Sequence, residues 1–334
     1  MKIITSLENI NIEEKTSIAL GNFDGIHLGH RRIMENAINA AKDNGALSLC
    51  FTFSNHPFNF ILNRADDDSC AAKLICSESE KIRLIEEMGF DTLVNIPFDE
   101  SILTMPADLF FDDIVRCRLN AGSVSVGFNY SYGARAGGNP ETLREACNAA
   151  GIDCNIQEAV RIDGEVVSST LIREMISEGN MERVAAYFGR AYSFRGRVEH
   201  GKRLGTAMGI PTVNIPAPTE IMLPPNGVYF SRIVIEGKEY KSISNLGIKP
   251  TIEKGKAEGE RKCGANDNAN ENKNKNKNKK SIETNIFDFN EDVYGKDIIV
   301  YFDHFSRPEY RFADKEELFA QIVKDCEAAQ LYLI

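Results

Sequence analysis

The pattern of apolar residues changes once along this chain, near Tyr192, and that change limits the folds it can adopt. Before it, short apolar runs alternate with stretches of helical periodicity, which predicts a parallel sheet wrapped by helices. After it, segments of period two are separated by turn residues, which is typical of antiparallel strands. Because 334 residues exceed what one core ordinarily supports, we expect two domains, residues 1–189 and 190–334.

The same patterns predict the individual elements. In the second domain we expect a hairpin turn at Glu236-Gly237 and a final amphipathic helix at 315–331, which keeps Leu318, Ile322, Ala329 and Leu331 for packing. Ligands of a parallel sheet bind beyond the carboxyl ends of its strands. The expected strands are 17–20, 47–53, 92–96, 123–126 and 154–157, then 193–199, 228–235, 240–244, 284–289 and 297–302; the expected helices of the first domain are 31–42, 78–88, 107–118 and 141–150.

Composition narrows the class of protein. The net charge of −10 argues against nucleic acid as the main partner, and no apolar run is long enough to span a bilayer. Eight scattered cysteines without a CxxC suit reduced thiols, so we expect a cytoplasmic protein with small-molecule partners and no membrane contact. Residues 253–280, which end in alternating Asn and Lys, predict a disordered insertion in a surface loop.

The decapeptide from Gly21 to His30, GNFDGIHLGH, places two histidines three residues apart after a buried strand. Gly21 and Gly25 permit a turn that brings the backbone close to a ligand, and a helix follows whose first N–H groups attract anions. His27 and His30 lie on one face of the first turn, and Gly29 between them carries no side chain. We interpret the segment as a nucleotide-phosphate site. A structural or zinc-binding histidine pair is the alternative.

Three hydroxyl residues, Ser168, Ser169 and Thr170, precede a helical run that continues to Ser177. Hydroxyl side chains at a helix start commonly cap it, and that interpretation stays open. Arg173 favours phosphate binding, because its planar guanidinium, one turn into the helix, suits phosphate oxygens beside the helix amides.

A second motif lies in the second domain, where residues 196–203 nearly spell a P-loop. Arg203 replaces the hydroxyl that would bind magnesium, and the glycines and proline that follow forbid the required helix, so we reject a P-loop. The next segment is GIPTVN, residues 209–214. Oxygen ligands beside phosphates suit Mg²⁺, which makes Thr212 and Asn214 candidate ligands.

Taken together, these motifs resemble the bacterial bifunctional riboflavin kinase/FMN adenylyltransferase (FAD synthetase) family, over nearly the whole chain except the insertion. Further blocks agree with the family in their order along the chain: FTFSNHP at 51–57, VGFNYSYG at 126–133, SNLGIKPT at 244–251, ETNIFDF at 283–289 and YGK at 294–296. At two positions the chain departs from the family, which more often has Pro at Asn55 and His at Asn285. The resemblance implies a nucleotidyltransferase-like α/β domain of the HxGH type, followed by an antiparallel β-barrel riboflavin kinase domain with a C-terminal helix.

The resemblance also implies the roles of particular residues. His30 would be catalytic in the first domain, and Glu283 would accept the hydroxyl proton in the second. His56 could equally be a buried capping histidine, and Glu283 a solvated residue of a strand edge. The implied ATP contacts of the adenylyltransferase are Gly21, Phe23, Asp24, His27, Gly29, His30, Ser168, Ser169, Thr170 and Arg173, with Asn129 and His56 on flavin or nucleotide; those of the kinase are Gly209, Pro211, Thr212 and Asn214, with Asn245 and Arg307 on flavin.

The implied function is two ATP-dependent reactions, with Mg²⁺ as cofactor and flavin as both substrate and product. The second domain would convert riboflavin to FMN, and the first would convert FMN to FAD and pyrophosphate. Only the kinase step has a neutral hydroxyl nucleophile, which explains why a carboxylate is expected there alone. Two alternatives remain: an FMN adenylyltransferase whose kinase domain is impaired by Asn285 and the long loop, or a non-catalytic flavin-binding regulator.

Overall fold

The computed structural model describes residues 1–64, 73–199, 211–248 and 280–333. Gly209 and residues 253–279 of the predicted insertion lie outside these ranges. The contacts divide the chain into two compact units: one holds Met1–Glu174, Tyr187–Arg190 and Glu220–Met222, and the other holds the rest. No helix in the described ranges is both long and apolar enough to cross a bilayer.

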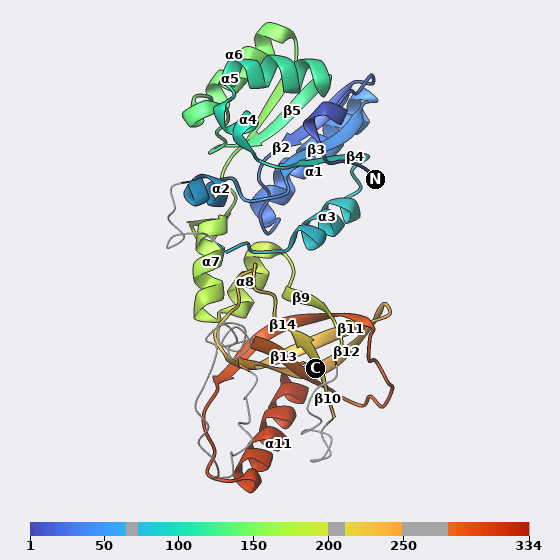
Figure 1. The fold of residues 1–334 in the computed structure, drawn as a ribbon, viewed down its shortest axis with the longest axis vertical. Coiled ribbons are helices and arrows are strands. Elements are labelled where there is room, and N and C mark those ends of the chain that lie inside the picture. The colour runs from blue at the N-terminus through green and yellow to red at the C-terminus, as the bar shows by residue number, and fades with distance from the viewer. Residues whose placement is uncertain (65–72, 200–210, 249–279, 334) are drawn as a thin grey trace, which may run out of the picture. The chain divides into compact units, whose positions relative to one another are not determined.

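The first unit is built on a six-stranded parallel sheet of order β1-β4-β3-β2-β5-β6 (Figure 1). The chain proceeds from β2 through β3 to β4 in one direction and then returns to place β5 on the other side of β2. The carboxyl ends of β2 and β5 therefore form a topological switch point, where open α/β sheets bind ligands. The strands are β1 (Lys2–Ile4), β2 (Thr16–Leu20), β3 (Leu47–Phe53), β4 (Thr92–Ile96), β5 (Ala121–Gly127) and β6 (Asp153–Gln157).

Apolar cores on the two faces of this sheet hold its helices. One core includes Met34 and Ala37 of α1 with Ile85 of α3, and the other includes Phe110 and Leu143. A short hairpin pairs β7 (Arg161–Ile162) with β8 (Glu165–Val166). The helices are η1 (Leu7–Asn9), α1 (Leu28–Asn44), α2 (Pro57–Arg64), α3 (Glu78–Glu87), α4 (Glu100–Thr104), α5 (Ala107–Leu109), η3 (Phe110–Arg118), η4 (Ala134–Ala136) and α6 (Pro140–Ala150). Two further helices, α7 (Ser169–Glu178) and α8 (Met181–Phe188), have residues in both units.

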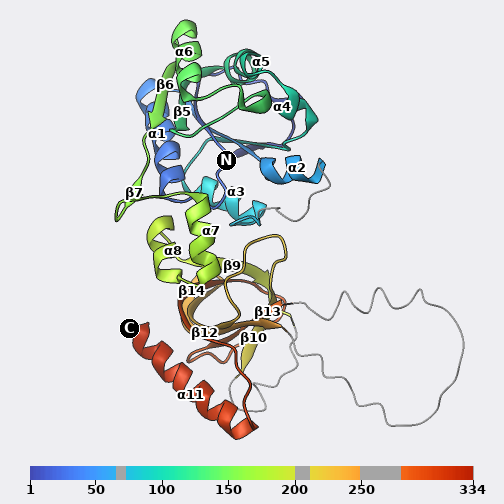
Figure 2. The same ribbon diagram turned by 90° about the vertical axis from the view of Figure 1, so that its left-hand side faces the viewer.

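The second unit is an antiparallel sheet of order β10-β13-β12-β11-β14-β9. A single bridge between Glu199 and Asn214 joins its two edges, so the sheet curls into a barrel, with α11 along the outside (Figure 2). The predicted hairpin turn is confirmed, because Glu236 and Gly237 both have positive φ between β11 and β12. The elements are β9 (Tyr192–Arg197), β10 (Thr212–Pro216), β11 (Gly227–Ile235), β12 (Lys238–Ile248), β13 (Lys280–Ile286), β14 (Asp297–Pro308) and α11 (Lys315–Tyr332).

The structure corrects several expected elements. The helix expected at 107–118 is a short α5 followed by the π-helix η3, whose wider turn buries both Phe110 and Phe111. Leu331 does not pack on the sheet: its side chain is 71% exposed, while Ala329 is buried. The strand expected at 284–289 begins earlier, at Lys280, and therefore contains Glu283. The sequence analysis also missed β1, α2, α4, the β7–β8 hairpin, α8 and β10.

Candidate active sites

The loop between β2 and α1 lies at the switch point and has a constrained backbone. Phe23 and Ile26 have φ of 51° and 43°, a left-handed conformation that is costly for residues other than glycine. The guanidinium of Arg190 donates to the carbonyl oxygens of Gly25 at 2.6 Å and Ile26 at 2.9 Å. Tertiary contacts thus hold this loop in a conformation that its own sequence does not favour.

His27 and His30 stack on each other at the start of α1, with ring centroids 3.6 Å apart. His27 is the N-cap, and its Nδ1 accepts the N–H of His30 at 3.2 Å, so its ring proton is on Nε2. Burial lowers the pKa of His27 to about 4 and that of His30 well below its ordinary value. Both rings are therefore neutral hydrogen-bonding groups at pH 7. A Cβ on Gly29 would lie 3.2 Å from the His27 ring, so this position suits a glycine.

Asp24 and Arg173 form an ion pair that connects the loop to α7. The Asp24 carboxylate also accepts the Ile75 N–H at 2.9 Å, and the Arg173 guanidinium donates to the Lys73 carbonyl at 3.0 Å. Ser169 Oγ donates to the Asp24 carbonyl at 3.2 Å. Asp24 and Arg173 thus pair with each other at the edge of the site.

Two cavities lie on either side of His30. One, of about 600 Å³, is lined mainly by apolar and aromatic side chains of β3, α2 and η3; the other, of about 190 Å³, lies between the start of α1 and residues 157–170. His30, Ile33, Gly127 and Asn129 line both cavities. A group bound in one cavity can therefore approach a group bound in the other beside His30.

The structure brings most of the residues predicted for the first domain to these cavities. Gly21, Phe23 and His56 line the larger one, while His27, Gly29 and the 168–170 segment line the smaller. Ser168 also caps α7, since its Oγ accepts the Leu171 N–H, as the alternative interpretation expected. His56 is not a capping histidine, because its buried Nδ1 has no partner among the described residues. The described residues also contain no group of three His, Cys, Asp or Glu suited to a metal, which is contrary to the zinc alternative.

In the second unit, four predicted kinase residues form a row across the sheet. Asn214 pairs with Glu283, Glu283 with Asn245, and Asn245 with Val228, which in turn pairs with Arg307. Because residues opposite each other on neighbouring strands project to the same face, this row lies on one face of the barrel wall. Val228 packs there with Ala329 of α11, so the row lies on the face next to that helix.

The polar residues of this row have hydrogen-bond and ion-pair partners on neighbouring elements. Glu283 is half-buried on β13, which lies between β10 and β12, so it is not a strand-edge residue. Asn245 Nδ2 donates to Glu309 at 3.0 Å. The Arg307 guanidinium pairs with Asp325 of α11 and packs over Tyr310. The guanidinium of Arg307 is therefore held by a carboxylate and an aromatic ring of the protein.

A cavity of about 270 Å³ lies beside the start of β10, where Pro211, Thr212 and Val213 line it together with Ile286 and residues 289–294. Asn285 Nδ2 donates to the Pro211 carbonyl at 2.8 Å and so holds the start of β10. The Oδ1 of Asn214 is buried and has no hydrogen-bond partner among the described residues. An unpartnered buried oxygen beside Thr212 fits a small hard cation or its water, since such ions prefer oxygen ligands.

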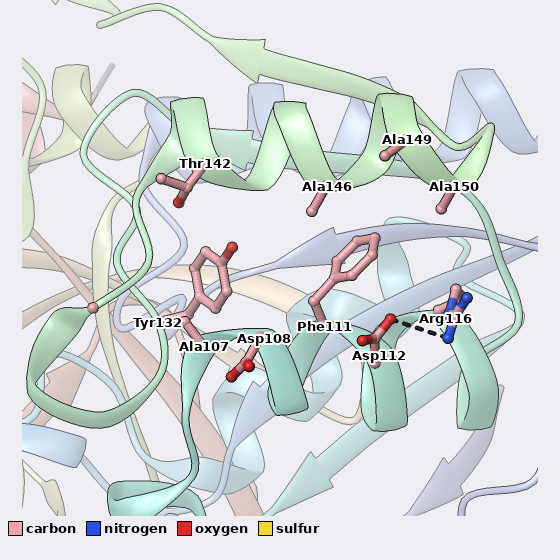
Figure 3. Close-up of a pocket in the computed structure, with 11 residues that line it drawn as sticks. Ala107, Asp108, Phe111, Asp112, Arg116, Tyr132, Thr142, Ala146, Ala149 and Ala150 are labelled. Atoms are coloured by element: carbon pink, nitrogen blue, oxygen red, sulfur yellow. Dashed lines mark ion pairs between the residues drawn. The ribbon is translucent and has the colours of Figure 1, made fainter.

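A further cavity, of about 390 Å³, lies between α6 and η3, and none of the predicted site residues lines it (Figure 3). The rings of Phe111 and Tyr132 point into it, and alanines of α6 form the opposite wall. Of its three charged residues, Asp112 and Arg116 pair with each other at 3.1 Å, and the third is Asp108. This cavity contains no cluster of groups with evident chemistry.

Sequence reasoning missed two cationic residues near the first site, the half-buried Arg190 and the buried Lys81. Arg190 anchors the β2–α1 loop but belongs to no motif, and it follows α8, which was itself not predicted. Lys81 lies on the predicted helix 78–88, where a lysine ordinarily indicates a solvated face, yet it is only 7% exposed. Only the contacts between segments distant in sequence show that Arg190 and Lys81 lie beside the first site.

The fold and the candidate residues agree with one class of protein: a two-unit transferase with an HxGH motif at the switch point of a parallel α/β unit and a carboxylate on a barrel wall. Family models agree with this class. The model for FAD synthetase matches residues 9–171, and the model for riboflavin kinase matches residues 188–333.

Comparison with individual proteins identifies the family. The bifunctional riboflavin kinase/FMN adenylyltransferase of Bacillus subtilis is 30% identical over 96% of this chain and 93% of its own length, and that of Escherichia coli K12 is 27% identical over 97% and 96%. The chain belongs to the bifunctional riboflavin kinase/FMN adenylyltransferase family. A solved structure of a Streptococcus pneumoniae protein named as a macrolide-efflux protein shares the fold, with a TM-score of 0.81 and 24% identity over 98% of each chain.

Proposed function

We propose that this chain phosphorylates riboflavin to FMN in its second unit and adenylylates FMN to FAD in its first, each time with ATP. The names of its relatives and the two matching family models support both activities. The observation that carries the adenylyl-transfer half is that His30 and Asn129 line both cavities of the first unit. In this assignment the larger, aromatic cavity binds the flavin ring system and the smaller one binds the adenosine of ATP.

Adenylyl transfer at this junction needs alignment and charge stabilisation. An oxygen of the FMN phosphate attacks the α-phosphorus of ATP, and the bond to pyrophosphate breaks. Because the attacking phosphate is already anionic, no general base is required. His27 and His30, which are neutral, donate N–H groups without adding charge, and the α1 amides and Arg173 stabilise the charge that develops on the phosphates. In this proposal Arg173 exchanges its contact with Asp24 for the phosphates of ATP.

The kinase reaction has a different requirement, because the nucleophile is a neutral ribityl hydroxyl. We assign Glu283 as the group that accepts the hydroxyl proton while the oxygen attacks the γ-phosphorus and ADP leaves. Its place in the row between Asn214 and Asn245 supports this assignment, since amide groups on either side can orient substrate oxygens. Pro211 and Thr212, at the neighbouring cavity, are assigned to ATP, and Asn245 and Arg307 to the flavin.

Thr212 and Asn214 would hold Mg²⁺, for which the unpartnered Asn214 Oδ1 is suited. When bound, the ion neutralises charge on the phosphates of ATP. Because these residues supply few oxygens, phosphate and water would complete its coordination. The proposal also includes the domain boundary near residue 189 and a cytoplasmic location, which the scattered cysteines of the sequence favour.

One experiment tests the function and separates it from its alternatives. The purified full chain is incubated with riboflavin, ATP and Mg²⁺, and riboflavin, FMN and FAD are separated by chromatography. We expect FMN to appear first and FAD to follow. Conversion of supplied FMN to FAD without any use of riboflavin would indicate an adenylyltransferase with an inactive kinase unit. Retention of bound flavin without conversion would indicate a flavin-binding regulator.

A further inference from the structure

Lys81 is a buried ammonium group that the assignments above do not use. It lies in the first turn of α3, and its side chain is only 7% exposed. It lines a small polar recess together with Asn22, Asp24 and His56. Lysine is almost never buried to this extent unless its charge is paired, so its surroundings decide what it does.

The protein does not satisfy this ammonium group. Of its three N–H donors, one is bonded to the carbonyl of Phe53. Among the described residues, no carboxylate oxygen lies within 4.0 Å of Nζ. The two carboxylates that share the recess are otherwise engaged: Asp24 with Arg173 and the Ile75 N–H, and Glu78 with Asn95 Nδ2 at 2.7 Å. Burial lowers the pKa of Lys81, and the nearby Asp24 and Glu78 carboxylates offset this effect only in part, so the charged form is costly without a closer anionic partner.

The recess, of about 10 Å³, adjoins the larger cavity of the first site, because Asn22 and His56 line both. The His56 ring also lacks a hydrogen-bond partner, since its buried Nδ1 has none among the described residues. Two unsatisfied polar groups thus border the place where the flavin cavity meets the β2–α1 loop. An anionic oxygen entering from that cavity would satisfy the ammonium group and neutralise its charge.

We propose that Lys81 binds phosphate oxygens of the adenylyl-transfer reaction, either of the FMN phosphate or of the departing pyrophosphate. This proposal rests on the assignment of the first unit as an adenylyltransferase. Lys81 is then a substrate-binding residue whose ammonium group makes no direct ion pair with a carboxylate of the described residues. Its burial keeps the charge unscreened by water and so makes the contact stronger.

The test uses the full chain with Lys81→Met, which keeps length and apolar volume but removes the charge, and Lys81→Arg, which keeps the charge. Lys42→Met, on the exposed end of α1, is the matched control. We expect Lys81→Met to lower kcat/KM for FAD formation from FMN at least about tenfold, as loss of a charged hydrogen bond does. Lys81→Arg should recover part of this loss. Riboflavin phosphorylation should be unchanged in all three variants.

Two binding measurements identify the phosphate concerned. If Lys81 holds the FMN phosphate, Lys81→Met weakens FMN binding, measured by flavin fluorescence, and leaves riboflavin binding unchanged. If it holds the departing group, FMN binding is unchanged, and the KM for inorganic pyrophosphate in the reverse reaction from FAD rises. A fall of FMN and riboflavin binding by equal factors would overturn the proposal, because it would show a general effect on the cavity.

Thermal melting of the ligand-free protein distinguishes binding from a structural role. Removing an uncompensated buried charge should not lower the melting temperature of the first unit. A large fall in Lys81→Met, or FAD formation equal to that of the wild type, would overturn the proposal. Absence of FAD formation in the wild type would instead contradict the proposed function itself, so the two failures are distinguishable.

Discussion

At the scale of single residues, the first site depends on polar groups kept neutral by burial. His27 and His30 stack face to face, and two imidazolium rings in that position would repel each other and lack solvent. The lowered pKa values of both rings are thus a direct consequence of the packing that places them at the start of α1. Neutral rings can donate to phosphate oxygens over the whole physiological pH range.

This burial predicts a pH dependence of stability. The pKa of His27 falls from 6.5 in the unfolded chain to about 4 in the folded one, so its contribution is fully present above pH 6.5 and is lost as the pH falls toward 4. His27→Asn keeps an N-cap acceptor but removes the titrating group. Between pH 7 and pH 4, the free energy of unfolding of the first unit should fall in both proteins. We expect the fall to be smaller in the variant than in the wild type by up to about 3 kcal/mol, measured by urea unfolding. Parallel pH profiles would contradict the neutral assignment.

At the scale of secondary-structure elements, each site combines segments that are distant in sequence. The β2–α1 loop is held by Arg190 and joined to α7 through Asp24 and Arg173. In the barrel, four strands contribute the residues of the kinase row. Regular strand register places these side chains about 5 Å apart between neighbouring strands, which is the spacing needed to contact one substrate.

Arg173→Lys tests the connection between the loop and α7. An ammonium group cannot bind Asp24 and the Lys73 carbonyl with the fixed geometry of a guanidinium, nor bind phosphate in bidentate fashion. We expect kcat/KM for ATP in FAD formation to fall about tenfold or more, with riboflavin phosphorylation unaffected. Steady-state kinetics with varied ATP measure this effect. Unchanged kinetics would show that Arg173 has no contact with ATP.

Glu283→Gln tests the row on the barrel wall. The substitution keeps size and hydrogen bonding but removes the proton acceptor, and loss of a general base typically costs about 10²- to 10⁴-fold in rate. We expect riboflavin phosphorylation to fall by that factor, while supplied FMN is converted to FAD at the normal rate. Thr212→Ala is a useful comparison, since it should raise the ATP requirement of the kinase step without removing the base. Normal phosphorylation by Glu283→Gln would refute the assignment.

At the scale of the whole molecule, the two reactions are assigned to different compact units, each with its own core and its own ATP site. The chemistry differs accordingly, because an anionic phosphate attacks in one unit and a neutral hydroxyl in the other. If the two sites work independently, a molecule that is defective in one unit should be complemented by another molecule in which that unit is intact.

Mixing two inactive variants tests this independence. His30→Ala should make FMN from riboflavin but no FAD, because it lacks a donor at the junction of the cavities. Glu283→Gln should make neither from riboflavin. We expect the mixture to produce FAD, with a lag while FMN accumulates in solution, as followed by chromatography. If the mixture makes FMN but no FAD, FMN does not pass through solution to the second molecule.

Much of this protein follows from local sequence. The strands at 47–53 and 92–96 have the predicted bounds, since a short apolar run between turn signals specifies a buried strand. The hydroxyl cap of α7 and the Glu236-Gly237 turn follow likewise from residue types at fixed spacing, whereas α1 begins at Leu28, three residues before the predicted start. These features depend on interactions within a few residues, which a sequence pattern records.

Other features were decided only by tertiary structure. The five-residue strand β10 has a weak local signal and exists because β13 pairs with it and places Asn214 opposite Glu283. The left-handed residues of the β2–α1 loop are held by Arg190, more than 160 positions away. The burial of Lys81 and the neutral state of His30 depend on all segments that exclude water from them. The sequence by itself therefore determined the elements and motifs, whereas desolvation and long-range pairing determined what those residues can do.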